Sequence, residues 1–310
     1  MDVSFLAWIA LIGVIGILLV VDLFFAHRHA EHISLREAAG WSVLWMAVGI
    51  AFGLVLLATL GGAAAGDYWA GFLLEKALSL DNVFVIAVLL TSFAVPQALK
   101  ADVLTFGIVG ALILRAIFIV AGVALLEMFH PALYVMGVLL VVTGLRIAIS
   151  DDEGESFAHG RLMTWLRRAL PIGHEFKGDR LFDRENGKRV ATPLLAALLA
   201  VAMADVVFAI DSIPAVLAIT TETFLVFAAN AFALLGLRAL YFLLDGAAQR
   251  FEYLHFGLGA LLVFVGVKML IEDVVHIPVG VSLGVIVATL GASIGVSLVL
   301  TARRERLTPT

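Results

Sequence analysis

Two apolar segments of the chain carry acidic and small polar side chains at matching intervals. Each holds an acid, an aspartate six residues later and a small polar residue directly after it: Glu75, Asp81 and Asn82 in EKALSLDNVFVIAVL (75–89), and Asp205, Asp211 and Ser212 in DVVFAIDSIPAVLAI (205–219). Carboxylate, amide and hydroxyl oxygens are ligands that hard divalent cations such as Mn²⁺, Ca²⁺ and Mg²⁺ prefer. Carboxylates inside membranes also relay protons. The pattern therefore predicts a cation site, a proton path, or one path that serves both.

The spacing limits how these oxygens can converge. Six residues along a straight α-helix rise about 9 Å and turn to a different face, so the two acids of one segment cannot share an ion. Seven residues restore the face, so the first acid of each segment can line a cavity with the small polar residue of that segment. Pro214 removes the hydrogen bond to the carbonyl of Ile210, which predicts a broken helix around Asp211.

The composition of the chain indicates its solvent. Of 310 residues, 62% are hydrophobic and only 15% are charged, with a mean hydropathy of +1.08. A soluble domain of this size needs more polar surface, so we expect the chain to lie in a lipid bilayer. The sequence has no cysteine, which leaves no disulfide and no thiolate metal site. It offers no basic face, which argues against nucleic acid as a partner.

Nine stretches have the length and apolarity of membrane-spanning helices, which need about 20 mostly apolar residues. They predict an all-α polytopic membrane protein, with spans at about 3–25, 41–60, 68–92, 103–125, 131–149, 192–219, 223–244, 253–271 and 278–300. Arginine and lysine are concentrated in the loops after the first, third, fifth and seventh spans and in the C-terminal segment. Because basic loops stay in the cytoplasm, we expect the N-terminus outside and the C-terminus in the cytoplasm. The first span has no basic segment before it and no cleavage site, so we expect it to be retained.

An internal repeat relates spans three to five with spans six to eight. Downstream of the acidic segments, the alignment continues through two pairs of basic positions: Arg115 in ALILRAIF with Arg238 in LLGLRALY, and Arg146 in LLVVTGLRI with Lys268 in LLVFVGVKM. A unit of three helices reverses direction, so we expect the repeats, about 68–149 and 192–271, to be inverted, as in many secondary transporters. We expect them to form one transporter domain over 1–310.

An inverted repeat also predicts where the acids lie. Span three enters the membrane from outside, and span six enters from the cytoplasm. We therefore expect Asp81 and Asp211 at the centre of the site. Glu75 would then lie toward the outside and Asp205 toward the cytoplasm.

The same acids can instead be structural partners of buried bases. The candidate partners are Arg115, Arg238, Lys76 and Lys268. Arg146 and Lys268 stand near span ends, where we expect their charged groups to reach the membrane interface. Asn230, in span seven, either links helices or adds a ligand.

Four motifs resemble the TerC family of integral membrane proteins over most of the chain: EKALSLDNVFV, ATPL, DVVFAIDSIPAVLAIT and NAFALLGLRALYFLL. The resemblance implies a polytopic protein of the LysE-like transporter superfamily, a role in metal-ion homeostasis, and manganese export as the activity. It also implies that the acids and small polar residues of the two segments form the ion site. The family name refers to tellurium resistance, which can be an indirect phenotype. This chain departs from the family pattern at Ala202, where many members carry an acid, which weakens the assignment to Mn²⁺.

Together these features predict a secondary transporter that exports divalent cations, Mn²⁺ first and Ca²⁺ or Mg²⁺ otherwise. With no Walker motif to use ATP, proton antiport is the expected coupling. We expect no tightly bound cofactor and no enzymatic activity, because no nucleophile, base and oxyanion arrangement is present. The expected location is the bacterial cytoplasmic membrane. The alternative is a non-transporting scaffold that assists assembly or metallation of membrane or exported proteins, with the cytoplasmic loop 150–191 as its docking surface.

Overall fold

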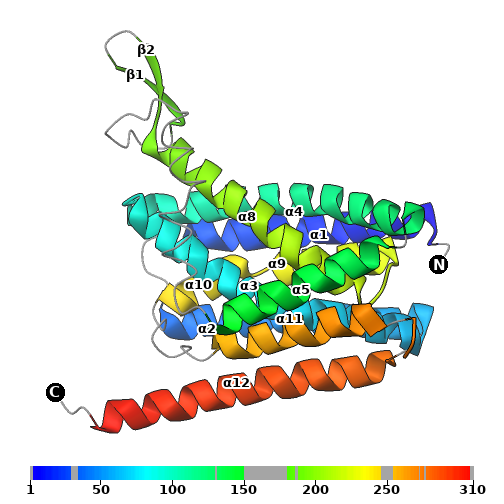
Figure 1. The fold of residues 1–310 in the computed structure, drawn as a ribbon. Helices are drawn as coiled ribbons and strands as arrows, with labels where there is room; N and C mark the ends of the chain where they lie inside the picture. The colour runs from blue at the N-terminus through cyan, green and yellow to red at the C-terminus, as the bar shows by residue number, and fades with distance from the viewer. Residues whose placement is uncertain are drawn as a thin grey trace.

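The computed structural model describes residues 3–28, 34–129, 131–149, 180–185, 188–245, 254–271, 273–275 and 277–307. Its helices are α1 (Phe5–Arg28), α2 (Leu35–Leu60), α3 (Gly62–Ser92), α4 (Gln97–Met128), α5 (Ala132–Ile149), α8 (Pro193–Leu217), α9 (Thr223–Leu234), α10 (Leu237–Asp245), α11 (Leu254–Ile271) and α12 (Val279–Leu307). Two short strands, β1 (Phe182–Glu185) and β2 (Lys188–Ala191), pair antiparallel directly before α8. The described chain is thus a helical bundle with one small hairpin (Figure 1).

Most helices of the described part have the length and composition of membrane spans. Six units qualify by both measures, namely α1, α2, α4, α8, the pair α9–α10, and α12. α5 and α11 are shorter apolar helices. α3 is 31 residues long, carries Asp67, Glu75, Lys76 and Asp81, and is not among these six. The predicted all-α polytopic membrane architecture is confirmed at this level, while the count of nine spans stays a prediction.

The outer helices present large apolar side chains to their surroundings. Exposed examples are Phe5 on α1, Val43 on α2, Phe106 on α4 and Val281 on α12. α9, in contrast, buries ten of its 12 residues and lies near the middle of the bundle in Figure 1. An apolar outer surface around a buried interior is the arrangement that a bilayer stabilises.

α5 and α11, the third helices of the two predicted repeats, cross through glycines. A Cβ atom at Gly144 would lie 2.6 Å from the carbonyl oxygen of Gly259, and one at Gly137 would lie 3.0 Å from that of Gly266. The two helices are therefore antiparallel. The repeat alignment pairs Gly137 with Gly259 and Gly144 with Gly266, so exchanging the repeats turns one contact into the other. α3 packing on α9 and α4 packing on α8 form a second such exchange. An inverted repeat would give such reciprocal contacts, and the division of the chain into two repeats stays a prediction.

Local hydrogen bonds join the hairpin to the start of α8. Thr192 caps the helix, because its side chain accepts a hydrogen bond from the N–H of Leu195 at 3.3 Å, and Pro193 suits the first helical turn. The N–H of Thr192 donates to the carbonyl of Leu181, and its hydroxyl donates to that of Arg180. Figure 1 shows the hairpin beyond the helices, at the same end as the end of α12 and opposite the start of α1.

The helix break that the sequence predicts around Asp211 is not present. α8 is helical through Asp211 to Leu217, with Pro214 inside it. The prediction for span six is therefore wrong in this structure. Proline removes one backbone hydrogen bond, and α8 tolerates that loss without unwinding.

The interruption lies in span seven instead. α9 ends at Leu234 and α10 begins at Leu237. Between them Gly236 has a φ of +77°, a left-handed backbone that side chains disfavour. A Cβ atom there would lie 2.4 Å from Cδ1 of Trp45 on α2. Both the backbone angle and the close approach of α2 therefore require glycine at this turn.

Candidate functional site

Glu75 on α3, Arg115 on α4 and Asp205 on α8 form a buried group, called here the acid–arginine cluster. Nη1 of Arg115 donates to Oε2 of Glu75 at 2.5 Å, and Nε of Arg115 lies 3.5 Å from Oδ1 of Asp205. The side chains of Glu75 and Arg115 are 0% and 1% exposed, and that of Asp205 is 13% exposed. The first acids of the two predicted segments, Glu75 and Asp205, thus contact the same guanidinium.

Asn82 completes the surroundings of the guanidinium. With its amide oxygen turned toward Arg115, it accepts a hydrogen bond from Nη2 at 3.1 Å, and its nitrogen donates to the carbonyl of Leu78 at 3.1 Å. We assign this orientation because it satisfies both ends of the amide. Asn82 stands seven residues after Glu75, so the predicted sharing of one helix face by these two residues is seen here.

The structure brings together two acids that the prediction places on opposite sides of the site centre. The sequence places Glu75 toward the outside and Asp205 toward the cytoplasm, whereas both contact Arg115 in the structure. Glu75 is the 14th of 31 residues in α3, and Asp205 is the 13th of 25 in α8. The reason is that α3 begins at Gly62, before the predicted start at 68, so its midpoint shifts from Asp81 toward Glu75.

The cluster leaves acceptor capacity unused. Oε1 of Glu75 and Oδ2 of Asp205 are buried and have no hydrogen-bond partner in the described part of the chain. Two carboxylates face one guanidinium, which leaves one negative charge uncompensated if both acids are ionised. Buried unpaired oxygens and a buried net charge are both costly. The arrangement can therefore accept a proton or a cation.

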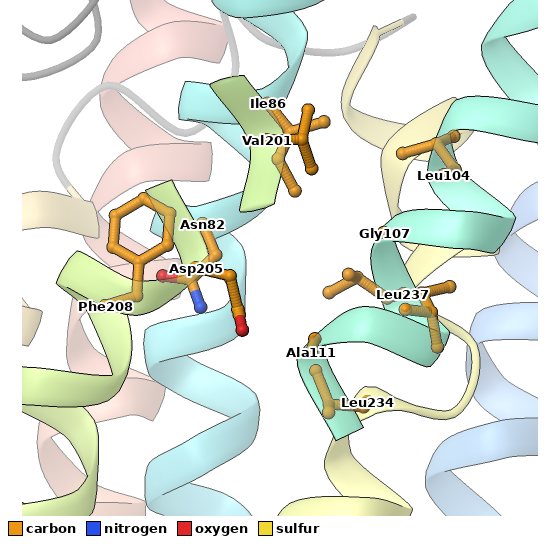
Figure 2. Close-up of a pocket in the computed structure, with 11 residues that line it drawn as sticks. Asn82, Ile86, Leu104, Gly107, Ala111, Val201, Asp205, Phe208, Leu234 and Leu237 are labelled. Carbon is orange, nitrogen blue, oxygen red and sulfur yellow. The ribbon is translucent and has the colours of Figure 1, made fainter. Parts of the chain in front are cut away.

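A small cavity opens beside the cluster (Figure 2). Its volume of about 20 Å³ gives room for about one water molecule. Asn82 and Asp205 are polar residues of its wall, and apolar residues and a glycine from α3, α4, α8, α9 and α10 form the remainder. Figure 2 shows Gly107 and Ala111 of α4 across from Asn82 and Asp205. Leu234 and Leu237, which flank the interruption in span seven, also line the cavity, so it extends from Asp205 to the broken helix.

The other residues of the predicted ion site are distributed differently. The side chains of Asp81 and Asp211 lie outside the described part, although their backbones are helical. The hydroxyl of Ser212 is buried and has no partner among the described residues. The same holds for both amide atoms of Asn230, so among the described contacts Asn230 does not link helices. These groups stay candidates for a polar ligand.

A complete metal-ligand set is not assembled among the described side chains. No three histidine, aspartate or glutamate side chains come together in that part of the chain. The two acids that do meet, Glu75 and Asp205, share an arginine instead.

Lys76 binds backbone carbonyls. Its Nζ donates to the carbonyl oxygens of Ala233 at 3.0 Å and Leu235 at 3.1 Å. These carbonyls lie at the end of α9, where the interruption leaves acceptors without helical partners. A cation is also favoured there by the helix dipole. Lys76 therefore stabilises the broken span.

Arg238, which the repeat aligns with Arg115, pairs with an acid that the sequence reasoning missed. Nη2 of Arg238 lies 3.1 Å from Oδ2 of Asp22 on α1 and also donates to the carbonyl oxygen of Asp22. Nη1 donates to the hydroxyl of Thr105 at 3.2 Å. Asp22 is buried, and an acid inside the apolar run of the first span was a signal that could have identified it.

The two bases near span ends differ from each other. Arg146 is exposed, as expected of a side chain that reaches the interface. Lys268 is only 3% exposed, so the same prediction is wrong for it. The repeat therefore aligns two bases whose surroundings are not equivalent.

Comparisons with known proteins agree on the class of protein. Residues 60–305 match the sequence profile of the integral membrane protein TerC family. The chain is 44% identical to an uncharacterized membrane protein, STKORF319, of Myxococcus xanthus, over 98% of this chain and 94% of that protein. It is 42% identical to the putative membrane-bound redox modulator Alx of Escherichia coli K12, over 91% of this chain and 90% of that protein. No solved structure matches the chain.

The matched range holds the main features of the candidate site. It includes the acid–arginine cluster, the cavity and the interrupted span, whereas Asp22 on α1 precedes it. The putative membrane-bound redox modulator Alx of Salmonella typhi is 40% identical over 97% of this chain and 96% of that protein, so the similarity also extends to α1. The chain therefore belongs to the TerC family of integral membrane proteins.

Proposed function

We propose that this protein exports divalent metal cations, with Mn²⁺ as the first candidate, in exchange for protons. The observation that carries the proposal is the meeting of Glu75 and Asp205, one acid from each predicted repeat, beside a cavity in a membrane protein. Ionisable side chains within membrane helices are costly and commonly mark ion or proton pathways. Inverted repeats of secondary transporters meet at such sites.

The substrate cation would bind oxygen ligands from both repeats. Glu75 and Asp205 supply the unpartnered carboxylate oxygens, and Asn82 adds an amide oxygen. Asp81, Asp211 and Ser212 belong to the proposed ligand set through their sequence positions. These hard ligands suit Mn²⁺, Ca²⁺ and Mg²⁺. Because Ala202 contributes no carboxylate, Ca²⁺ and Mg²⁺ stay candidates beside Mn²⁺.

Protons supply the driving force in this proposal. The cytoplasm is electrically negative, so export of two charges is uphill by about 4.6 kcal/mol per 100 mV of membrane potential. A proton that enters from outside can neutralise a carboxylate of the cluster and weaken its hold on the cation. The cation then leaves toward the outside, and the proton leaves toward the cytoplasm.

The proposed orientation follows the charge of the loops. The end of the bundle that carries the hairpin and the end of α12 would face the cytoplasm of a bacterial inner membrane, with the N-terminus outside. Glu127, exposed near the end of α4, would then face outward. Because the chain has no cysteine, Glu127→Cys gives a single label site. Labelling by an impermeant maleimide in intact cells is expected, and labelling only after lysis would reverse the orientation.

Transport by purified protein in liposomes tests the proposal. The vesicles hold a dye that Mn²⁺ quenches, and an imposed pH gradient drives uptake. We expect Asp205→Asn to slow gradient-driven quenching by about tenfold or more, since it removes a carboxylate from the path. Glu127→Gln, which removes an exposed acid from α4, is expected to keep the wild-type rate. Equal rates for wild type and Asp205→Asn, or no flux of Mn²⁺, Ca²⁺ or Mg²⁺ by wild type, would contradict the proposal.

A scaffold that assists other membrane or exported proteins is the second candidate. The hairpin favours it, because β1 and β2 stand beyond the helices and are fixed to α8. The relatives from E. coli and S. typhi are named putative redox modulators. The 310 residues of this chain hold no cysteine, so they offer no thiol for direct disulfide exchange. Deletion of 152–188 separates the candidates, because a transporter should keep flux, whereas a docking scaffold should lose its activity.

A further inference from the structure

We propose that Arg115 is an internal counter-cation, which the transported cation displaces and which rebinds the acids when the cation has left. This inference rests on the proposed function and concerns the regulation of the same site. Its structural basis is that one guanidinium already occupies the position between the acids of the two repeats.

The first argument is the burial of Arg115 together with its partners. The side chain is 1% exposed, and it faces Glu75 at 2.5 Å, Asp205 at 3.5 Å and Asn82 at 3.1 Å. A guanidinium stays charged at any physiological pH. Arg115 therefore cannot lose its charge by deprotonation, and the oxygens of these three residues must compensate that charge.

The second argument is the balance of charge. Two ionised carboxylates and Arg115 together carry one negative charge, whereas the same group with a bound divalent cation carries one positive charge. Without Arg115 in place, a divalent cation and the two carboxylates are neutral. Because net charge in the membrane interior is costly, the cation and the guanidinium compete for Glu75 and Asp205.

The third argument is the space beside Arg115. Gly107 and Ala111 precede Arg115 by about two turns and one turn of α4, and both line the cavity. Leu104 and Ile108 of α4 also line the cavity, so the two small residues open only part of that wall. The cavity has room for about one water molecule, so it allows the guanidinium to shift along α4, without taking it up whole, when a cation takes its carboxylates.

The fourth argument is the difference between the two aligned arginines. Arg238 is held by Asp22 of α1, which lies outside both repeats, and by Thr105. Of these two arginines, Arg115 is the one that contacts the repeated acids in the described part of the chain. We therefore assign the exchange with the transported cation to Arg115 and not to Arg238.

Two transport assays on the same vesicles separate this role from simple support of the site. Net uptake requires the empty site to turn from one side of the membrane back to the other. Exchange of radioactive Mn²⁺ for unlabelled Mn²⁺ does not, because the site returns with an ion bound. In Arg115→Gln the emptied site holds uncompensated carboxylates, so we expect net uptake to fall by about tenfold or more. Exchange does not pass through the empty site, so it is expected to fall less, and the ratio of net uptake to exchange should drop by about tenfold.

Two further variants serve as rescue and control. Arg115→Lys keeps a positive charge but cannot bridge two carboxylates as a planar guanidinium does, so we expect partial recovery of net uptake. Arg146→Gln removes an exposed arginine from α5 and is expected to match wild type in both assays. Size-exclusion chromatography checks that each variant is folded.

The outcomes distinguish the inference from the proposed function. If folded Arg115→Gln loses exchange and net uptake equally, or keeps both, the counter-cation role is wrong while transport stands. If Arg115→Gln does not fold, Arg115→Lys decides, and an unchanged ratio of net uptake to exchange overturns the inference. If wild type shows neither net uptake nor exchange, the proposed function fails, and the inference fails with it.

Discussion

Arg115 and Arg238 occupy aligned positions in the two predicted repeats, yet they compensate different acids. Arg115 contacts Glu75 and Asp205, whereas Arg238 pairs with Asp22. The Asp22–Arg238 pair ties α1 to α10, far from each other in sequence. Removing one member of a buried pair typically costs about 3–5 kcal/mol, while apolar replacement of both is often neutral. The Asp22–Arg238 pair therefore has a structural role, whose energy a double-mutant cycle can measure.

The cycle consists of Asp22→Leu, Arg238→Leu and both together. We expect each single variant to lower the thermal midpoint of unfolding in detergent, because it leaves a buried charge without its partner. The double variant is expected to be more stable than either single variant. Additive losses of stability in the double variant would show that the ion pair does not couple the two helices.

The candidate residues could be identified from sequence in part. Glu75, Asn82 and Asp205 were recognisable because charged and amide side chains are costly inside apolar runs. Their positions also match between the two segments. The pairing of both acids with Arg115 was left open, since sequence spacing gives no distance between helices. The predicted separation of Glu75 from Asp205 was wrong, because both contact Arg115. Asp22 escaped notice because its partner lies on α10.

At the scale of elements, the interruption in span seven shapes the site. Lys76 binds the carbonyls at the end of α9, and the cavity touches both sides of the break. The sequence drew attention to Pro214, whose effect on a helix is well known, and not to Gly236. A glycine inside a membrane helix is common. Its left-handed backbone depends on Trp45 and on the neighbouring helices, which sequence alone does not reveal.

Gly236→Ala tests how strictly this turn is required. We expect a loss of about 1–3 kcal/mol in unfolding free energy, since the left-handed backbone is strained with a side chain. The new methyl would also collide with Trp45. Gly284→Ala on α12 is the matched control, because a Cβ atom there meets open space. Equal thermal midpoints for the two variants would mean that the turn tolerates a side chain.

At the scale of the whole molecule, the predicted repeat would bring acids from distant segments together. Charged positions made the repeat visible in the sequence, and the reciprocal glycine contacts of α5 and α11 match its inverted form. The hairpin was not predicted, although Asn186 and Gly187 form a dipeptide typical of hairpin turns. Residues 150–179 of the loop predicted as a docking surface lie outside the described residues.

The central claim is that the acids of the two repeats bind the transported cation. Anomalous scattering from Mn²⁺ in crystals of the manganese-bound protein tests it most directly. The account predicts a manganese peak coordinated by Glu75 and Asp205, with the guanidinium of Arg115 moved away from both. Manganese bound elsewhere, with Arg115 still joining Glu75 and Asp205, would contradict it.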